Sequence, residues 1–149
     1  MQSESEGWKM LKREAILLAS EGRIHEAIIV LNKAIGNADL VHPFEIALLQ
    51  NKLASLYIKI GEATKAELAA RESIRLEQEF GDCGAETTNY ADFCFLLAKS
   101  LEVQGRYTEA LPWAEEAAKI LSELVGTDND LVKGVLSFRD LLRENSWRG

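Results

Sequence analysis

The chain has 149 residues, a mass of 16.6 kDa and 47% hydrophobic residues, which predicts one domain, residues 1–149, with a sizeable core. Its formal net charge of −7 and its lack of any basic run disfavour binding to nucleic acid. No stretch reaches the roughly 18 apolar residues of a membrane span, and the amino-terminal residues lack the features of a signal peptide.

Composition also bounds the fold class and the compartment. Ten glycines and two prolines, set among many alanine, leucine, glutamate and lysine residues, favour helix over strand and predict an all-α fold. The two cysteines, Cys83 and Cys94, lack the CxxC spacing of metal or redox sites, and a chain of this length needs no disulfide staples. We therefore expect reduced thiols in a cytoplasmic protein.

Apolar periodicity predicts seven helices along the chain. In chain order they lie near residues 7–20, 24–37, 44–60, 63–79, 86–104, 108–124 and 129–145. The first six form three antiparallel pairs, each made of a first helix, a tight turn and a second helix. The seventh, capped by Thr127, Asp128 or Asn129, covers the exposed face of the third pair, as terminal repeats must. The predicted architecture is an α-α superhelix of three pairs plus a capping helix.

The pairs repeat one pattern around Gly22, Gly61 and Gly105, which are 39 and 44 residues apart. An alanine stands seven residues before and five residues after each glycine, and small side chains at such points let helix axes approach closely. Glycine suits the left-handed conformation that closes a first helix. The six alanines are Ala15, Ala27, Ala54, Ala66, Ala98 and Ala110. The register predicts repeats near residues 7–38, 44–80 and 86–125.

This register resembles that of the tetratricopeptide repeat. The residues that carry the resemblance are Leu53-Ala54, Tyr57, Gly61 and Ala66 in the second copy and Leu97-Ala98, Gly105, Tyr107, Ala110 and Ala117 in the third. The copies exceed the family's minimum period of about 34 residues. The segment from Gly105 to Pro112 is similar to the longer repeats of the kinesin light chain subgroup. The resemblance implies a helical scaffold that binds other proteins, and it does not name the ligand.

In stacked helix pairs the first helices line the concave surface, so their residues that face away from the second helices are candidate ligand contacts. These residues are Lys12, Ile16, Asn51, Ser55, Lys59, Phe95 and Lys99. Lysines in the groove of an acidic chain favour an acidic peptide or a free carboxylate as the ligand. The alternative is that the lysines are ordinary solvated positions and that Phe95 belongs to the core.

The sequence contains only weak candidates for a metal site, a phosphate-binding loop or a catalytic site. His25 and His42 lie at no metal-ligand spacing with the cysteines, and the Gly81-Asp82-Cys83-Gly84 segment lacks the lysine and the strand of a phosphate loop. Carboxylates of the second helices, including Glu67 and Glu77, are expected to be solvated and locally paired. We therefore expect no metal, no cofactor and no catalytic site.

The function predicted from the sequence is a protein-protein interaction scaffold that holds a peptide or helix of a partner in the concave groove. Two alternatives stay open. The chain could assemble with itself through the terminal helix and Trp147, or it could be a regulatory fragment of a larger multidomain protein. Of the other tryptophans, Trp113 is expected to pack between helix pairs, and Trp8 either seals the amino-terminal end or contacts a neighbour.

Overall fold

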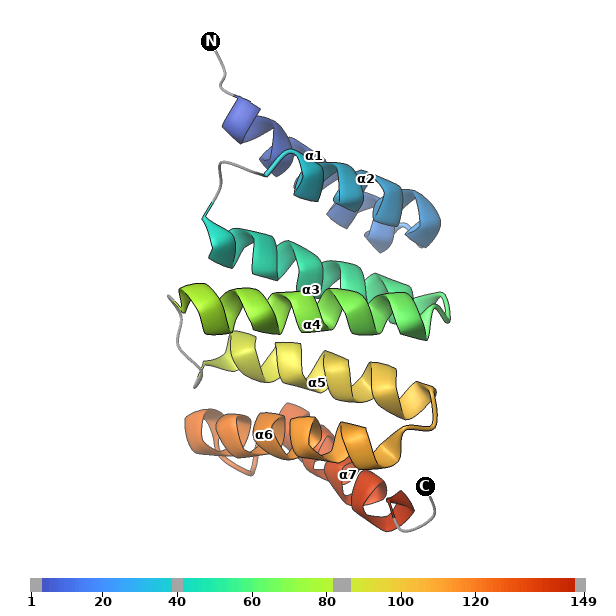
Figure 1. Cartoon of the computed structure of the whole chain (residues 1–149), viewed down its shortest axis with the longest axis vertical. Coiled ribbons are helices and arrows are strands. Elements are labelled where there is room, and N and C mark those ends of the chain that lie inside the picture. Colours follow the sequence, from blue (N-terminus) through green and yellow to red (C-terminus); the bar gives the residue numbers. More distant parts are fainter. Residues whose placement is uncertain (1–3, 39–41, 82–86, 147–149) are drawn as a thin grey trace.

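The computed structural model describes residues 4–38, 42–81 and 87–146, and within them it contains seven helices and no strand. Figure 1 shows the helices stacked along one axis, with the two termini at opposite ends. The helices are α1 (Glu4–Ser20), α2 (Ile24–Gly36), α3 (Pro43–Lys59), α4 (Ala63–Phe80), α5 (Thr88–Val103), α6 (Tyr107–Val125) and α7 (Asp130–Asn145). Every predicted helix is confirmed, with bounds that differ by three residues or fewer. The predicted start at residue 86 lies outside the described residues, as do Cys83 and Trp147.

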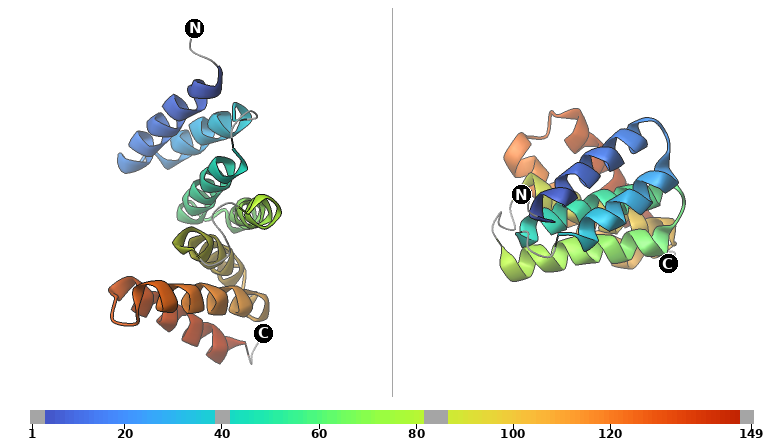
Figure 2. Two further views of the ribbon diagram at one scale, coloured as in Figure 1. Left: turned by 90° about the vertical axis from the view of Figure 1, so that its left-hand side faces the viewer. Right: turned by 90° about the horizontal axis from the view of Figure 1, so that it is seen from above.

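The helices pack as the three predicted pairs, α1 with α2, α3 with α4 and α5 with α6, and α7 packs on α6. In the left view of Figure 2, α2 and α4 lie on one side of α1 and α3, whereas α6 runs across the stack. The helix directions turn along the stack, because α3 and α4 are seen end-on in the left view of Figure 2 while α6 lies across it. The fold is therefore the predicted α-α superhelix.

Each pair turns at its glycine in a left-handed conformation. Gly22, Gly61 and Gly105 have φ angles of 81°, 79° and 78°, where a side chain would be strained. At the third turn, the Arg106 amide donates to the Leu101 carbonyl and the Gly105 amide donates to the Glu102 carbonyl, both at 2.9 Å. The same two bonds recur at the other two turns. They satisfy the last carbonyls of each first helix, so the glycines end these helices as the sequence predicts.

The core runs continuously through the stack. All six alanines of the repeat register are buried, and the larger side chains between them include Phe93, Leu97 and Leu101. Trp113 of α6 packs against this core and lies beside Arg71 and Ile74 of α4, which confirms its predicted place between pairs. Trp8 is also buried. Close helix packing at small residues thus sets how the exposed faces of neighbouring helices lie relative to one another.

Helix starts are capped where the chain enters α3, α5 and α7. His42 Nδ1 accepts from the Phe44 amide at 3.1 Å, and Thr87 Oγ1 accepts from the Tyr90 amide at 3.2 Å. Asn129 Oδ1 accepts from the Leu131 amide at 2.8 Å, so Asn129 caps α7 among its three candidates. Pro112 lies within α6 near its start, where a proline is compatible with the helix.

Candidate functional site

The seven predicted contact residues lie on α1, α3 and α5, and we call the side of the stack that these helices and α7 line the first-helix face. Neighbouring first helices touch along it. Asn51 Nδ2 of α3 donates to Asp92 Oδ2 of α5 at 2.6 Å. Phe95 of α5 meets Phe138 of α7 edge to face, with ring centroids 5.3 Å apart. Side chains of successive repeats therefore form one surface on this face.

A hollow of about 290 Å³ lies where α1 meets the start of α3. Its lining residues are Trp8, Lys9, Lys12, Arg13, Ile16 and Glu45. Lys9 Nζ lies 5.9 Å from the centre of the Trp8 ring, and Ile16 is 44% exposed. Within the described residues, neither Lys12 nor Arg13 forms an ion pair. The hollow thus combines an apolar wall with cations that are available to an anionic ligand.

The opposite end of the first-helix face is more crowded. Lys99 Nζ lies 3.2 Å from Glu102 Oε1 and 5.2 Å from the centre of the Phe138 ring. Phe95 is half-buried beneath the same ring. A ligand that binds Lys99 must compete with these neighbours, so we expect Lys99 to attract an anion less strongly than Lys12 does.

The middle of the face carries Ser55 and Lys59 on α3. Ser55 is half-buried and Lys59 is exposed. Lys59 forms no ion pair with any residue that the structure describes. Asn51, one turn earlier, already uses its amide group on Asp92, and it is therefore held in place between α3 and α5.

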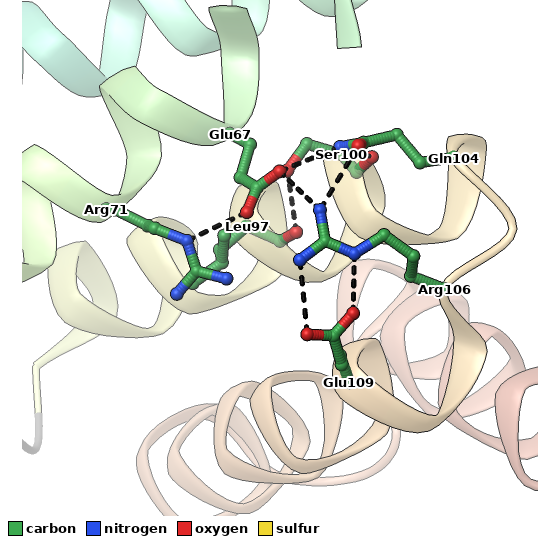
Figure 3. Close-up of polar contacts among 7 residues, drawn as sticks. All are labelled: Glu67, Arg71, Leu97, Ser100, Gln104, Arg106 and Glu109. Carbon is green, nitrogen blue, oxygen red and sulfur yellow. Dashed lines mark hydrogen bonds and ion pairs between the residues drawn. The ribbon is translucent and has the colours of Figure 1, made fainter. Parts of the chain in front are cut away.

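A polar network outside the predicted site joins the second and third pairs (Figure 3). Glu67 of α4 accepts from Arg71 Nε at 2.9 Å, from Gln104 Nε2 at 3.0 Å and from Arg106 at 2.7 Å. Arg106 also donates to Glu109 at 2.5 Å, and Gln104 donates to the Ser100 carbonyl at 3.0 Å. The turn after α5 is thereby tied to α4.

The burial of Glu67 corrects the expectation that it is a solvated carboxylate. Glu67 and Glu77 are only 9% and 4% exposed. Burial raises the pKa of Glu67, but hydrogen bonds from Gln104, Arg71 and Arg106 outweigh it and leave the pKa below its ordinary value. Sequence spacing reveals Arg71 four residues away, whereas Arg106 lies 39 residues away and meets Glu67 only because the pairs stack. Glu67 has the contacts of a structural residue.

Cys94 lies in the core, and its environment disfavours the thiolate. Burial is the main cause and the Glu116 carboxylate adds to it, whereas a hydrogen bond with Tyr90 opposes them, and the balance raises the pKa of Cys94 to about 12. A thiol with that pKa is about one ten-thousandth ionised at pH 8, against about a quarter for an ordinary cysteine. The structure therefore places Cys94 among packing residues and not among nucleophiles.

We expect native Cys94 to resist thiol reagents. In a Cys83→Ser variant at pH 8, labelling by a chromogenic disulfide should be at least about a hundredfold slower than in the same variant unfolded in urea, since the thiolate is the reacting species. Equal labelling rates before and after unfolding would show that Cys94 is accessible and ionised, contrary to its burial.

The described residues contain no group of three or more histidine, cysteine, aspartate or glutamate side chains that could hold a metal ion. Among them there is also no helix long and apolar enough to cross a membrane.

Comparisons with known proteins agree with this architecture. A family model described as a tetratricopeptide repeat matches residues 96–130, which include the turn at Gly105 and all of α6. A crystal structure of a protein from Podosopora anserina, described as a kinesin light chain with nearly identical TPR-like repeats, is similar with a TM-score of 0.82 at 15% identity, over 98% of this chain and 69% of that one. A second crystal structure, of a variant of that protein with one substitution, is similar with a TM-score of 0.72 at 15% identity, over 99% of this chain and 76% of that one.

None of the curated protein sequences compared with the chain matches it. The family match covers the second half of α5 and all of α6, while the structural similarity covers nearly the whole chain. Residues 96–130 therefore match the tetratricopeptide repeat, and nearly the whole chain has the fold of kinesin-light-chain-like tetratricopeptide repeats.

Proposed function

We propose that the chain holds an acidic segment of a partner protein against the first-helix face, with the hollow between α1 and α3 as the main contact. The tetratricopeptide-type fold supports a general role in protein-protein interaction. The proposed contacts are Lys12, Ile16, Asn51, Ser55, Lys59, Phe95 and Lys99. Location in the cytoplasm stays a prediction from the cysteine content.

The observation that supports this function best is the local reversal of charge at the hollow. The chain has a net charge of −7, yet Lys9, Lys12 and Arg13 gather around one opening. Because the wall of Trp8 and Ile16 is apolar, a carboxylate held there exchanges water for charged donors beside a hydrophobic surface. Glu45 at the rim disfavours a second carboxylate at that point, which favours a segment with one acid next to an apolar residue.

Reversing one lysine tests this proposal. We expect Lys12→Glu to weaken binding of a fluorescent twelve-residue peptide of alternating glutamate and leucine by about tenfold, because it removes one charge-assisted contact and adds repulsion. Fluorescence anisotropy at low salt measures the change, and raising the salt to about 0.5 M should weaken wild-type binding as well.

Two controls make this test specific. Lys133→Glu makes the same change of charge at an exposed position on α7 and should leave the affinity unchanged. A peptide with glutamine in place of glutamate should bind weakly to every variant. If Lys12→Glu and Lys133→Glu bind the acidic peptide alike, the hollow is not the contact and the proposal is wrong.

A further inference from the structure

The repeat register shows which face of a first helix packs on the preceding pair. Twelve, eight and five residues before its turn glycine, α3 carries Leu49, Leu53 and Leu56, which are 1%, 4% and 1% exposed. The residues of α5 at the same three positions are each 0% exposed: Phe93, Leu97 and Ser100. Spacings of four and three residues put all three positions on one side of a helix.

The element that covers this side is the second helix of the preceding pair. Leu97 lines a hollow together with Arg71 and Ile74 of α4. Leu53 lines a hollow that also includes Asn32 of α2. At both junctions between successive pairs (the seams), an amphipathic second helix therefore lies over the same side of the first helix that follows it.

In α1 the same three positions are Met10, Glu14 and Leu17, and we call them the outer face of α1. Met10 is 63% exposed and Leu17 is 60% exposed, and Glu14 is exposed between them. The helix α1 itself lies at the amino-terminal end of the stack (Figure 1). Two large apolar side chains thus face solvent at positions that the other repeats bury, which marks an unoccupied packing surface.

The other end of the stack differs at particular register positions of α7, although α7 also exposes Leu131 and Leu141. Arg139 follows the capping residue Asn129 at the same distance as Leu97 follows Thr87, so it stands where Leu97 stands in α5. It lines a hollow with Glu115 and Lys119 of α6, which match Arg71 and Arg75 in register. The positions of buried Ala98 and Leu101 are then taken by two exposed, ion-paired residues, Asp140 and Arg143. At these two positions α7 exposes charged residues to solvent, whereas the outer face of α1 exposes Met10 and Leu17.

We propose that the outer face of α1 docks an amphipathic helix of a partner protein, one that carries apolar residues at helical spacing and an arginine or lysine opposite Glu14. The docked helix continues the packing of α2 on α3 and of α4 on α5. The molecule offers a parallel: where α7 has Arg139 at this position, the facing residues of α6 include two acids, Glu115 and Glu123, beside Lys119. Glu14 has the opposite charge to Arg139, so it favours an arginine or lysine at the facing position of the docked helix.

A second copy of the chain fits this face poorly. Each of its second helices is already covered, because α2 lies between α1 and α3, α4 between α3 and α5, and α6 between α5 and α7. The cap α7 offers Asp140 and Arg143 in place of small residues. A free helix of a partner protein can cover the outer face while all seven described helices of the chain keep their places.

A peptide with the sequence of α4, residues 63–80, is a suitable probe, because its Arg71 and Arg75 would lie near Glu14 as they lie near Leu97 in the structure. We expect this peptide to bind the full chain with a dissociation constant below about 1 mM, measured by isothermal calorimetry. Leu17→Glu should weaken it at least about tenfold, since it buries an unpaired charge. Leu17 is exposed, so circular dichroism should show an unchanged fold.

Charge reversal sharpens the test. Glu14→Arg should weaken the α4 peptide about fivefold to tenfold, and a peptide with Arg71→Glu and Arg75→Glu should recover most of that loss on the Glu14→Arg protein. Lys12→Glu should leave α4-peptide binding unchanged, and Leu17→Glu should leave acidic-peptide binding unchanged, so this inference and the proposed function fail separately.

Three results would overturn the inference. The first is no binding of the α4 peptide at about 1 mM. The second is equal binding by wild type and Leu17→Glu, which would indicate that the peptide displaces α4 from its own place in the array. The third is a dimer, seen by light scattering, that Leu17→Glu abolishes, since a second copy would then occupy the face.

Discussion

Leu97→Ala is expected to lower the free energy of unfolding by about 3 kcal/mol, the largest effect among the substitutions considered for this chain. Leu97 is fully buried and lies where α4, α5 and Trp113 of α6 meet. Truncation removes apolar contacts and leaves a void that closely packed helices fill only in part. For a chain of this length, thermal unfolding should shift downward by about 6–12 °C. Chemical denaturation at pH 7 followed by circular dichroism measures the change.

The matched control is Leu68→Ala in α4. Leu68 is a helical leucine too, but it is 66% exposed. The same truncation there should change the stability by no more than about 0.5 kcal/mol. Comparable losses at both positions would mean that Leu97 is not the junction of the second and third pairs.

Glu67→Gln is expected to destabilise the chain by about 1–2 kcal/mol at pH 7, because the neutral amide accepts less strongly from Arg71, Gln104 and Arg106. The effect depends on pH in a defined direction. Since the folded-state pKa of Glu67 lies below its ordinary value of 4.5, the carboxylate contributes full stability above pH 4.5. That contribution is lost as the pH falls through the folded-state pKa.

The measurement is the difference in unfolding free energy between wild type and Glu67→Gln, from urea titrations at several pH values between about 3 and 7. The difference should be largest near neutral pH and shrink in acid. Glu115→Gln serves as the control, because Glu115 pairs with Arg143 at the surface and such pairs contribute about 0–1 kcal/mol. A difference for Glu67→Gln that stays constant over the whole range would contradict the proposed charge-assisted role.

The helices and turns could be predicted from the sequence because their causes are local. Gly61 and Gly105 end first helices through their own backbone angles, and Ala54 and Ala98 mark close helix contacts at a fixed distance before them. Such signals need only a window of some twenty residues. At the start of α7 the sequence allows three capping residues, and the geometry of one hydrogen bond identifies Asn129.

The features that the sequence did not reveal depend on how the pairs stack. Glu67 meets Arg106 across a seam, and nothing within one helix of either residue indicates that contact. The hollow at α1 behaves similarly. The sequence predicts that Lys12 and Ile16 face a ligand, and Trp8 shares their side of α1, but the acid Glu45 joins them only through the offset between α1 and α3. Helix offset is a property of the whole array, and local patterns do not encode it.

The tie between Glu67 and Arg106 has a consequence for how the array moves. At the corresponding positions of the preceding seam stand Ile28 and Glu62, and the contact of α2 with α3 is less extensive than that of α4 with α5. A stack of helix pairs bends most readily where the packing contact between successive pairs is smallest. We therefore expect the first pair to change its angle relative to α3–α7 more readily than these five helices change their angles to one another. The hollow between α1 and α3 lies at this junction, so a segment bound there would fix the angle between the first pair and the other helices.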